Sequence, residues 1–167
     1  MPTIDKIIED NLHLVFGSKN RLMKMDGFDY AFSVSTNISE NGKDYSQTEA
    51  VRIGMIADEL VLNSIKAIYG VENPHRASNI HESRKIKGRI RFNVYEDKRN
   101  YILSCQDNGC GILEENKNRV FDNGFSTRGT TGIGLGMIRD HVTDLGGRTY
   151  FDSEVGVGTT FYVKLPK

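Results

Sequence analysis

The spacing of apolar positions predicts two helices and a strand in the first part of the chain. In residues 3–16 apolar side chains recur every three or four positions, as in an amphipathic helix. Residues 28–38 instead alternate between apolar and polar positions, which indicates a strand. Ser46 and Glu49 have the spacing of a capping box. A second helix is therefore expected from there to Gly70, a residue that commonly follows the last turn of a helix.

The second part of the chain contains four strand-like runs that pair as two hairpins. These runs are residues 89–96, 101–106, 148–154 and 159–165. Between the hairpins, residues 107–136 carry seven glycines and little regular pattern, and a helix is expected over residues 136–145. Residues 71–88 are polar and basic without periodicity, which predicts a loop. The order predicts an α/β sandwich, a mixed, mostly antiparallel sheet covered on one face by about three helices.

Composition narrows the class of protein without naming a function. The 167 residues suit a single domain, with residues 1–45 leading into a core over residues 46–167. Lys plus Arg and Asp plus Glu both number 22, so the net charge is zero, which argues against broad binding to nucleic acid or to an anionic membrane. No apolar run approaches the roughly 20 residues needed to cross a bilayer. Two cysteines five positions apart favour reduced thiols and a cytoplasmic location over a disulfide framework.

Three segments carry candidate chemistry, and the first lies on the second helix. Glu59 and Asn63 are four residues apart, and Lys66 follows three residues later, so all three share one helix face. A carboxylate, an amide oxygen and an ammonium group can together hold magnesium, water and phosphate. The plain alternative is a solvated helix face.

The second segment follows a predicted strand. Asp107 precedes Gly109 and Gly111, so one carboxylate stands beside exposed backbone. Such a carboxylate can accept a hydrogen bond from an exocyclic amine of a base, and the glycines allow close approach of a flat ring. An ordinary Asx turn is the alternative.

The third segment, residues 129–136, leads directly into a helix. Backbone amides of a glycine-rich loop and the N-terminus of the helix form a phosphate site. The spacing matches neither a Walker A loop nor a dinucleotide-binding loop. Taken alone, the segment could equally be a flexible linker.

The three segments together, in this order, resemble the ATP-binding domain of the GHKL superfamily, the group of histidine kinases, gyrase, Hsp90 and MutL. The resemblance covers residues 46–166 and implies the Bergerat fold. Its boxes match residues 59–67 (N box), 107–111 (first glycine box), 121–125 (F box) and 129–136 (second glycine box). The tail over residues 146–161 closely resembles the closing hairpin of histidine kinases.

The resemblance implies ATP and Mg²⁺ as cofactors and assigns a role to each matching residue. Asn63 is expected to ligate Mg²⁺, with Glu59 as a second candidate ligand, and Lys66 to reach a phosphate. Asp107 is expected to bind the adenine amino group, with Thr159 supporting it from the neighbouring strand.

The remaining implied roles belong to the loops. Gly109 and Gly111 are expected to shape the base pocket. The expected phosphate-binding set is Gly132, Gly134, Leu135 and Gly136. Arg128 is expected to meet the γ-phosphate from a lid formed by residues 112–131.

Glu59 departs from the pattern of many histidine kinases, which carry Asn at this position. A glutamate here is typical of the ATP-hydrolysing relatives, in which it activates water, and of some kinase subgroups. Both a general base and a helper of the magnesium shell fit, and a polarising role is favoured.

The phosphoacceptor histidine of a complete histidine kinase is not evident. Of His13, His75, His81 and His141, only His81 precedes an acidic residue, and no predicted helical hairpin surrounds it. The leading hypothesis is therefore the catalytic domain of a sensor histidine kinase whose acceptor lies in another chain or a missing segment, with a response regulator as an indirect partner.

Three other functions remain open from the sequence. The chain could be a stand-alone serine kinase of the anti-sigma type, a hydrolysing clamp of the gyrase, Hsp90 or MutL kind, or a non-catalytic nucleotide sensor. Separately, the basic loop over residues 71–88 could dock an acidic partner, lie over phosphate or be a solvated insertion.

Overall fold

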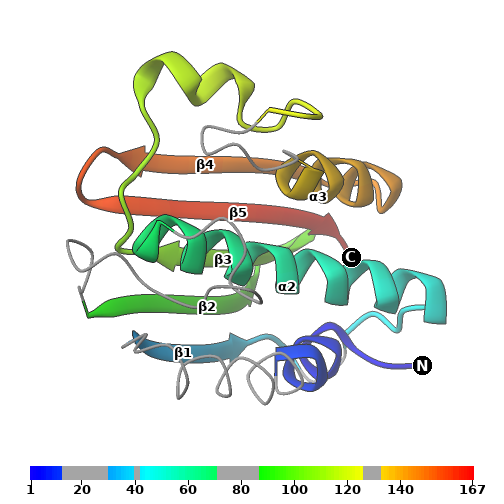
Figure 1. Cartoon of the computed structure of the whole chain (residues 1–167). Coiled ribbons are helices and arrows are strands. Elements are labelled where there is room, and N and C mark those ends of the chain that lie inside the picture. The colour runs from blue at the N-terminus through cyan, green and yellow to red at the C-terminus, as the bar shows by residue number, and fades with distance from the viewer. Residues whose placement is uncertain (13–29, 40–41, 71–86, 126–132) are drawn as a thin grey trace.

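The computed structural model describes residues 1–12, 30–39, 42–70, 87–125 and 133–167 (Figure 1). Within these residues the chain forms one mixed sheet with helices packed on one of its faces. No helix in these ranges is long and apolar enough to cross a bilayer.

Five strands form the sheet in the order β1-β2-β3-β5-β4. β1 (Tyr30–Asn37) pairs in parallel with β2 (Gly88–Glu96). The other pairings are antiparallel and join β2, β3 (Asn100–Asp107), β5 (Gly158–Pro166) and β4 (Arg148–Glu154). The prediction of a mixed, mostly antiparallel sheet is confirmed, and each strand-like run forms a strand.

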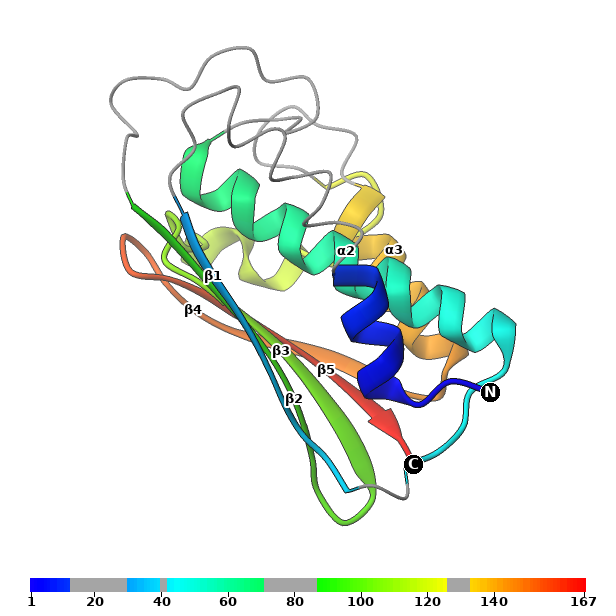
Figure 2. The same cartoon turned by 90° about the horizontal axis from the view of Figure 1, so that it is seen from below.

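Within the described residues three α-helices are seen, as the sequence predicts. They pack on the same face of the sheet (Figure 2). They are a helix over residues 4–12, α2 (Gln47–Tyr69) and α3 (Ile133–Asp144). The side chains between these layers are almost wholly buried and form a single core, to which the first helix contributes Ile4 and Ile8. The two-layer sandwich is therefore confirmed.

α2 begins and ends where its sequence signals predict. The Ser46 hydroxyl accepts a hydrogen bond from the Glu49 backbone N–H at 3.3 Å, and a Glu49 carboxylate oxygen accepts one from the Ser46 N–H at 2.8 Å. Both halves of the capping box are thus formed. Gly70 follows the last turn with a left-handed φ of 67°, which costs glycine little.

The structure corrects two boundaries and adds one element. α3 begins at Ile133, not at residue 136, so Gly134 and Gly136 lie inside its first turns. Glycine has low helix propensity, but packing of the helix against α2 overrides that preference. The glycine-rich stretch also contains a 3-10 helix, η2 (Glu114–Arg119), that its sequence did not reveal. Finally, residue 88 begins β2 and does not belong to the loop.

Other predictions reach beyond the described residues, among them residues 28–29 of the predicted first strand. The first helix is seen over residues 4–12, and the rest of its predicted span lies outside them. Residues 71–86 of the predicted basic loop also lie outside them.

Candidate functional site

The middle of α2 and the first turn of α3 meet at the predicted phosphate end of the site. A Cβ atom added to Gly134 would stand 2.7 Å from a Glu59 carboxylate oxygen and 3.7 Å from both polar atoms of the Asn63 amide. The absence of a side chain at Gly134 therefore allows the start of α3 to approach the polar face of α2. The structure brings together two boxes that are about 70 residues apart in the sequence.

Asp107 lies at the end of β3 and is only 5% exposed. Its Oδ1 accepts hydrogen bonds from the backbone N–H of Gly109 at 2.8 Å and of Thr159 at 3.3 Å. The carboxylate is therefore fixed between the first glycine box and the adjacent strand β5. Thr159 is 4% exposed, as expected of a residue that supports Asp107 from its neighbouring strand.

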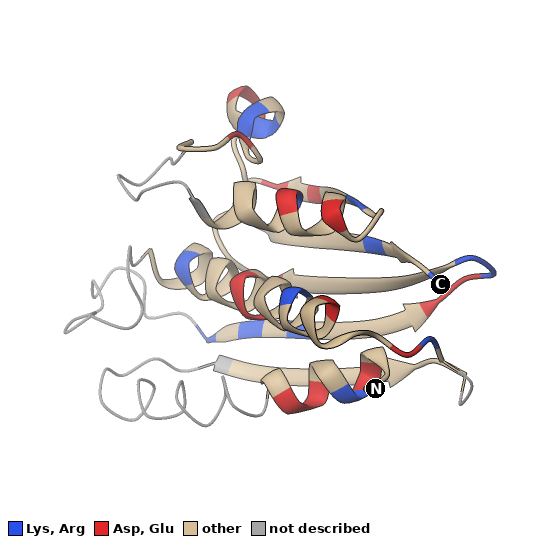
Figure 3. Ribbon diagram, turned by 90° about the vertical axis from the view of Figure 1, so that its right-hand side faces the viewer, with Lys and Arg blue, Asp and Glu red and all other residues tan. Residues whose placement is uncertain are grey.

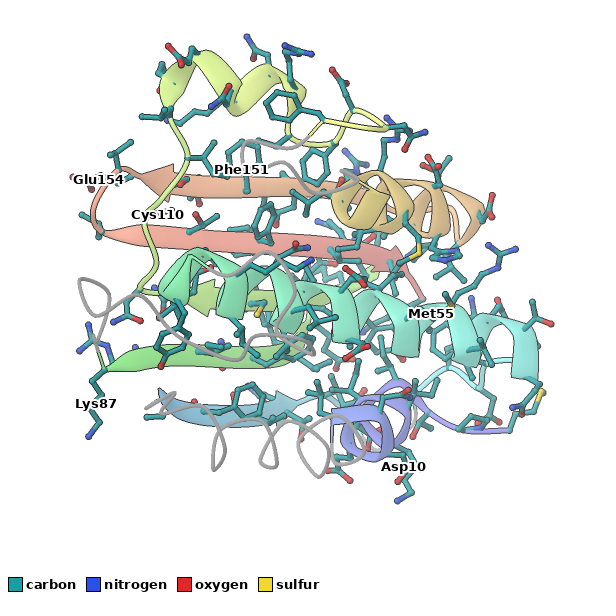
Figure 4. The ribbon with its side chains drawn as sticks, viewed as in Figure 1. Asp10, Met55, Lys87, Cys110, Phe151 and Glu154 are labelled. Atoms are coloured by element: carbon teal, nitrogen blue, oxygen red, sulfur yellow. The ribbon has the colours of Figure 1, made fainter. Side chains whose placement is uncertain are left out.

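The first glycine box packs directly on the end of α2. A Cβ added to Gly109 would stand 2.7 Å from the carbonyl carbon of Ala67, and the next residue, Cys110, donates its N–H to the Ala67 carbonyl at 3.1 Å. Gly111 has a φ of 72° and lies against the Glu154 carbonyl. Figure 4 shows Cys110 and Glu154 at the same end of the sheet.

Ser153 is a residue of the site that sequence reasoning missed. Its hydroxyl oxygen accepts the Ile112 N–H at 2.8 Å and lies 2.9 Å from the Thr159 hydroxyl and 3.2 Å from the Gly158 carbonyl oxygen. Ser153 thereby joins β4, β5 and the segment after the first glycine box. The alternation of β4 could have placed it on the helix-facing side, because it stands two residues after Phe151.

The F box is held by both the sheet and α3. The Phe121 ring lies 5.9 Å from Phe151 and 6.1 Å from Phe161 between ring centroids, and the Arg139 guanidinium donates to the Phe121 carbonyl at 2.9 Å. Asn123 occupies the space beside Gly136 that a side chain there would need. The described contact of Gly136 is thus with the F box, and its expected phosphate contact stays a prediction.

The described residues fit a magnesium site of the kind completed by phosphate and water. They contain no cluster of three or more His, Cys, Asp and Glu side chains, so an all-protein metal cage is not formed within them. Mg²⁺ commonly uses one or two protein oxygens together with substrate phosphates. Asn63 suits that role through its amide oxygen. Its amide nitrogen is buried and has no hydrogen-bond partner within the described chain, so it is a donor that an oxygen of phosphate or water would satisfy. A buried polar atom of this kind is costly unless a ligand or water satisfies it.

Several predicted residues fall elsewhere. Arg128 and Gly132 lie outside the described residues, as do residues 126–131 of the expected lid. Leu135 is partly buried against the core, which gives it a packing role. Lys66 lies half-buried in the last turn of α2.

Of the four histidines, only His141 is described, and it does not belong to the site. Its Nδ1 lies 3.1 Å from the Arg52 guanidinium. It stands in the last turn of α3, whereas the residues near Asn63 belong to the first turn. His13, His75 and His81 lie outside the described residues.

Among curated proteins, the chain is similar to several sensor kinases over part of its length. It is 42% identical over 67 residues to a probable C4-dicarboxylate sensor kinase of Halalkalibacterium halodurans, covering 39% of this chain and 13% of that protein. It is 39% identical over 67 residues to the sensor histidine kinase DcuS of Escherichia coli, covering 38% and 12%. A longer match, 29% identical over 135 residues, is to the sensor protein RprX of Bacteroides fragilis and covers 75% and 25%. The chain thus spans a quarter or less of the length of these relatives.

Solved structures share the fold. The catalytic domain of the histidine kinase ThkA superposes with a TM-score of 0.72 at 21% identity, covering 99% of this chain and 95% of that one. The mycobacterial sensor histidine kinase MprB gives 0.68 at 19% identity, covering 99% and 95%. The family model described as "Histidine kinase-, DNA gyrase B-, and HSP90-like ATPase" matches residues 48–167, which include the polar face of α2, the Asp107 loop and the start of α3, and the chain belongs to that family.

Proposed function

We propose that this chain is the ATP- and magnesium-binding catalytic domain of a sensor histidine kinase. It transfers the γ-phosphoryl group of ATP to a histidine carried by another chain or another segment. A cytoplasmic location and a response regulator downstream belong to the same proposal. Support comes from membership of the ATPase family and from similarity to proteins named sensor kinases.

The observation that carries the proposal is the meeting of α2 and α3 at Gly134. There the Glu59 carboxylate and the Asn63 amide stand beside the N-terminal turn of α3. A helix N-terminus offers unpaired backbone N–H groups and a positive dipole end, which favour phosphate. The Asn63 amide oxygen would hold the magnesium ion, and phosphate and water oxygens would complete its coordination.

The base end is formed by Asp107. Its Oδ1 is already occupied by two backbone N–H donors, which orient the carboxylate. In the proposed complex the carboxylate accepts a hydrogen bond from the adenine amino group. Gly109 and Gly111 keep the adjacent backbone free of side chains. Adenine and phosphate are then recognised at opposite ends of one site.

Bound magnesium would neutralise charge on the phosphates during transfer. The bond between the γ-phosphorus and the bridging oxygen breaks, a bond from the acceptor imidazole nitrogen to phosphorus forms, and ADP leaves. In this proposal Glu59 polarises the acceptor by holding the N–H of the imidazole, which leaves the other nitrogen as the nucleophile. Lys66, Gly132 and Arg128 are proposed to contact the phosphates.

One observation favours a second candidate, ATP hydrolysis. The carboxylate of Glu59 stands at the phosphate end, where it could equally accept a proton from water. An acid-stable phosphoserine on a partner is the product of a third candidate, the anti-sigma type of serine kinase. The products of the three reactions are chemically different, so one assay separates them.

The assay incubates the chain with γ-labelled ATP and Mg²⁺, alone and with a separately expressed acceptor hairpin. We expect acid-labile, base-stable label on the acceptor, and loss of that label with Asn63→Ala. Asn37→Ala, at an exposed position at the end of β1, is the matched control and should transfer normally. Release of free phosphate without labelled protein, or acid-stable label, would replace the proposal by hydrolysis or serine phosphorylation respectively.

A further inference from the structure

The face of the sheet opposite the helices is not covered by any described helix (Figure 2). Strand alternation assigns its side chains: in β2, for example, Ile90 and Phe92 are buried under the helices, whereas Arg89 and Arg91 are exposed on the other side. We call this surface the open face. Antiparallel sheets often leave such a face to water, so exposure alone implies nothing.

The open face carries an ordered separation of charge. One row runs directly across four paired strands, from Arg91 on β2 through Gln106 and Thr160 to Asp152 on β4. Arg89 and Glu154 repeat the same signs one step nearer the end of the sheet, on the same strands. A cavity of about 630 Å³ lies at this end of the sheet. All six of these residues line it, together with residues of the helix-facing side such as Asp107 and Ser153. Figure 3 colours the basic and acidic residues on these strands.

These charges cannot neutralise each other within one chain. Neighbouring strands lie about 4.8 Å apart, so three spacings separate the Arg91 and Asp152 backbones by about 14 Å. Within the described residues, Arg89 and Arg91 form no ion pair, and Glu154 forms none either. The positive side along β2 and the negative side along β4 are therefore both available to a partner.

The pattern is complementary to itself under two-fold symmetry. An axis parallel to the strands, lying above the boundary between β3 and β5, places β2 of one copy over β4 of the other. Position along the strand is preserved, so Arg91 faces Asp152 of the second copy and Arg89 faces Glu154. In an isologous interface every pair occurs twice. Aligned sheets pack about 10 Å apart, a gap that an extended arginine and a short carboxylate can bridge.

We propose that the open face binds the open face of a second copy of this chain, with the basic side of each copy facing the acidic side of the other. The residue types beside the charged row also support an interface between proteins. Tyr150 and Tyr162 stack with ring centroids 4.7 Å apart and an interplanar angle of 11°, and Tyr150 is 42% exposed. Tyrosine and arginine are enriched at protein interfaces.

The contact is weak and salt-dependent, because exposed ion pairs contribute little individually and are screened. The test therefore measures molecular mass by sedimentation equilibrium on the full chain over a wide range of concentration, in low and in high salt. We expect a reversible dimer at high concentration in low salt that dissociates as salt is added.

Charge reversal gives the decisive comparison. In a dimer of the Arg91→Glu variant, each Glu would face Asp152 of the other copy, which gives two pairs of negative charges. In a dimer of the Asp152→Arg variant, each new Arg would face Arg91 of the other copy, which gives two pairs of positive charges. Each variant alone should dimerise at least about tenfold more weakly than the parent chain. An equimolar mixture restores both attractive pairs, so the two variants should associate with each other. Lys98→Glu, in the exposed turn between β2 and β3, is the matched control and should leave dimerisation unchanged.

Three results would overturn the proposal. They are a monomer at every concentration, a dimer that neither reversal weakens, and a mixture of the two weakened variants that stays monomeric. Asp152 also accepts a hydrogen bond from Tyr162, so folding of each variant is verified by circular dichroism and ATP binding. Arg89→Glu and Glu154→Arg repeat the experiment with an independent pair should Asp152→Arg fail to fold.

Discussion

Asp107→Asn separates the proposed role of this carboxylate in binding from its role in the fold. The substitution keeps the shape of the side chain and keeps an oxygen that can accept the Gly109 and Thr159 N–H groups, now at 2.8 and 3.3 Å. These two bonds lose only the charge assistance of a carboxylate, which we put at about 0.5–1 kcal/mol each. The free energy of unfolding should therefore fall by about 1–2 kcal/mol, and the protein stays folded.

ATP binding should change much more. The second oxygen of Asp107 becomes an NH₂ group, which meets the adenine amino group donor to donor. Losing that hydrogen bond and leaving two buried donors unpaired costs about 2–4 kcal/mol. At 1.4 kcal/mol per tenfold, the affinity for ATP should weaken about 30- to 700-fold.

Isothermal titration calorimetry with ATP and Mg²⁺ measures this effect, and thermal unfolding verifies the fold. Asp44→Asn, at an exposed position before α2, is the matched control and should bind ATP as the parent chain does. If folded Asp107→Asn binds ATP within about threefold of the parent chain, the assignment of Asp107 to adenine is refuted.

Three further predictions concern the stability of the fold that holds the candidate site. Gly109→Ala places a Cβ 2.7 Å from the Ala67 backbone, so the glycine box must shift away from α2. We expect the free energy of unfolding, measured by chemical denaturation, to fall by about 2–4 kcal/mol because of overpacking and a lost hydrogen bond. Ser46→Ala removes the cap of α2 and should cost about 1 kcal/mol in the same assay, whereas an unchanged midpoint would contradict the capping box. Hydrogen bonds from Ser46 lower the pKa of Glu49 below 4.5, and bonds led by Lys164 lower the pKa of Asp97 below 3.8. Both groups stabilise the fold above these values, so the melting temperature should fall as the pH drops below about 4.5.

The fold was largely predictable because its signals are local. Alternation along β2 and β3 and the three-to-four spacing along α2 each report which side of an element is buried. Ser46 and Gly70 mark the ends of α2 through hydrogen bonds formed within a few residues. Such signals need no knowledge of the rest of the chain.

The start of α3 and the 3-10 helix η2 were not predictable in the same way. Gly134 and Gly136 disfavour a helix locally, and the helix forms there because each glycine lets another segment pack closely, Glu59 in one case and Asn123 in the other. That reason lies in tertiary contacts. The local sequence pattern therefore does not predict where α3 starts.

The candidate site shows the same division. Asn63 and Asp107 were singled out from local context, because one is a polar residue on a helix face and the other directly follows a strand; their roles in binding stay predictions. Ser153 was missed because its importance lies in hydrogen bonds to two other segments, the neighbouring strand β5 and Ile112, which is 41 residues away. The sequence alone does not show which groups a serine in a strand will contact, because that depends on the register of β4 and β5.

The glycines of the candidate site therefore serve the packing of the protein, in addition to the approach of a ligand that we propose for them. Gly109 sets the first glycine box against the end of α2, and Gly134 sets the start of α3 against its middle. Both contacts are made on α2, so this one helix positions the proposed base end and the proposed phosphate end relative to each other. Since Ile53, Ile56 and Leu60 of α2 are almost fully buried in the core, a displacement of either end would disturb core packing. The packing of the core thus fixes the distance between the proposed base end and the proposed phosphate end, which one nucleotide would have to span.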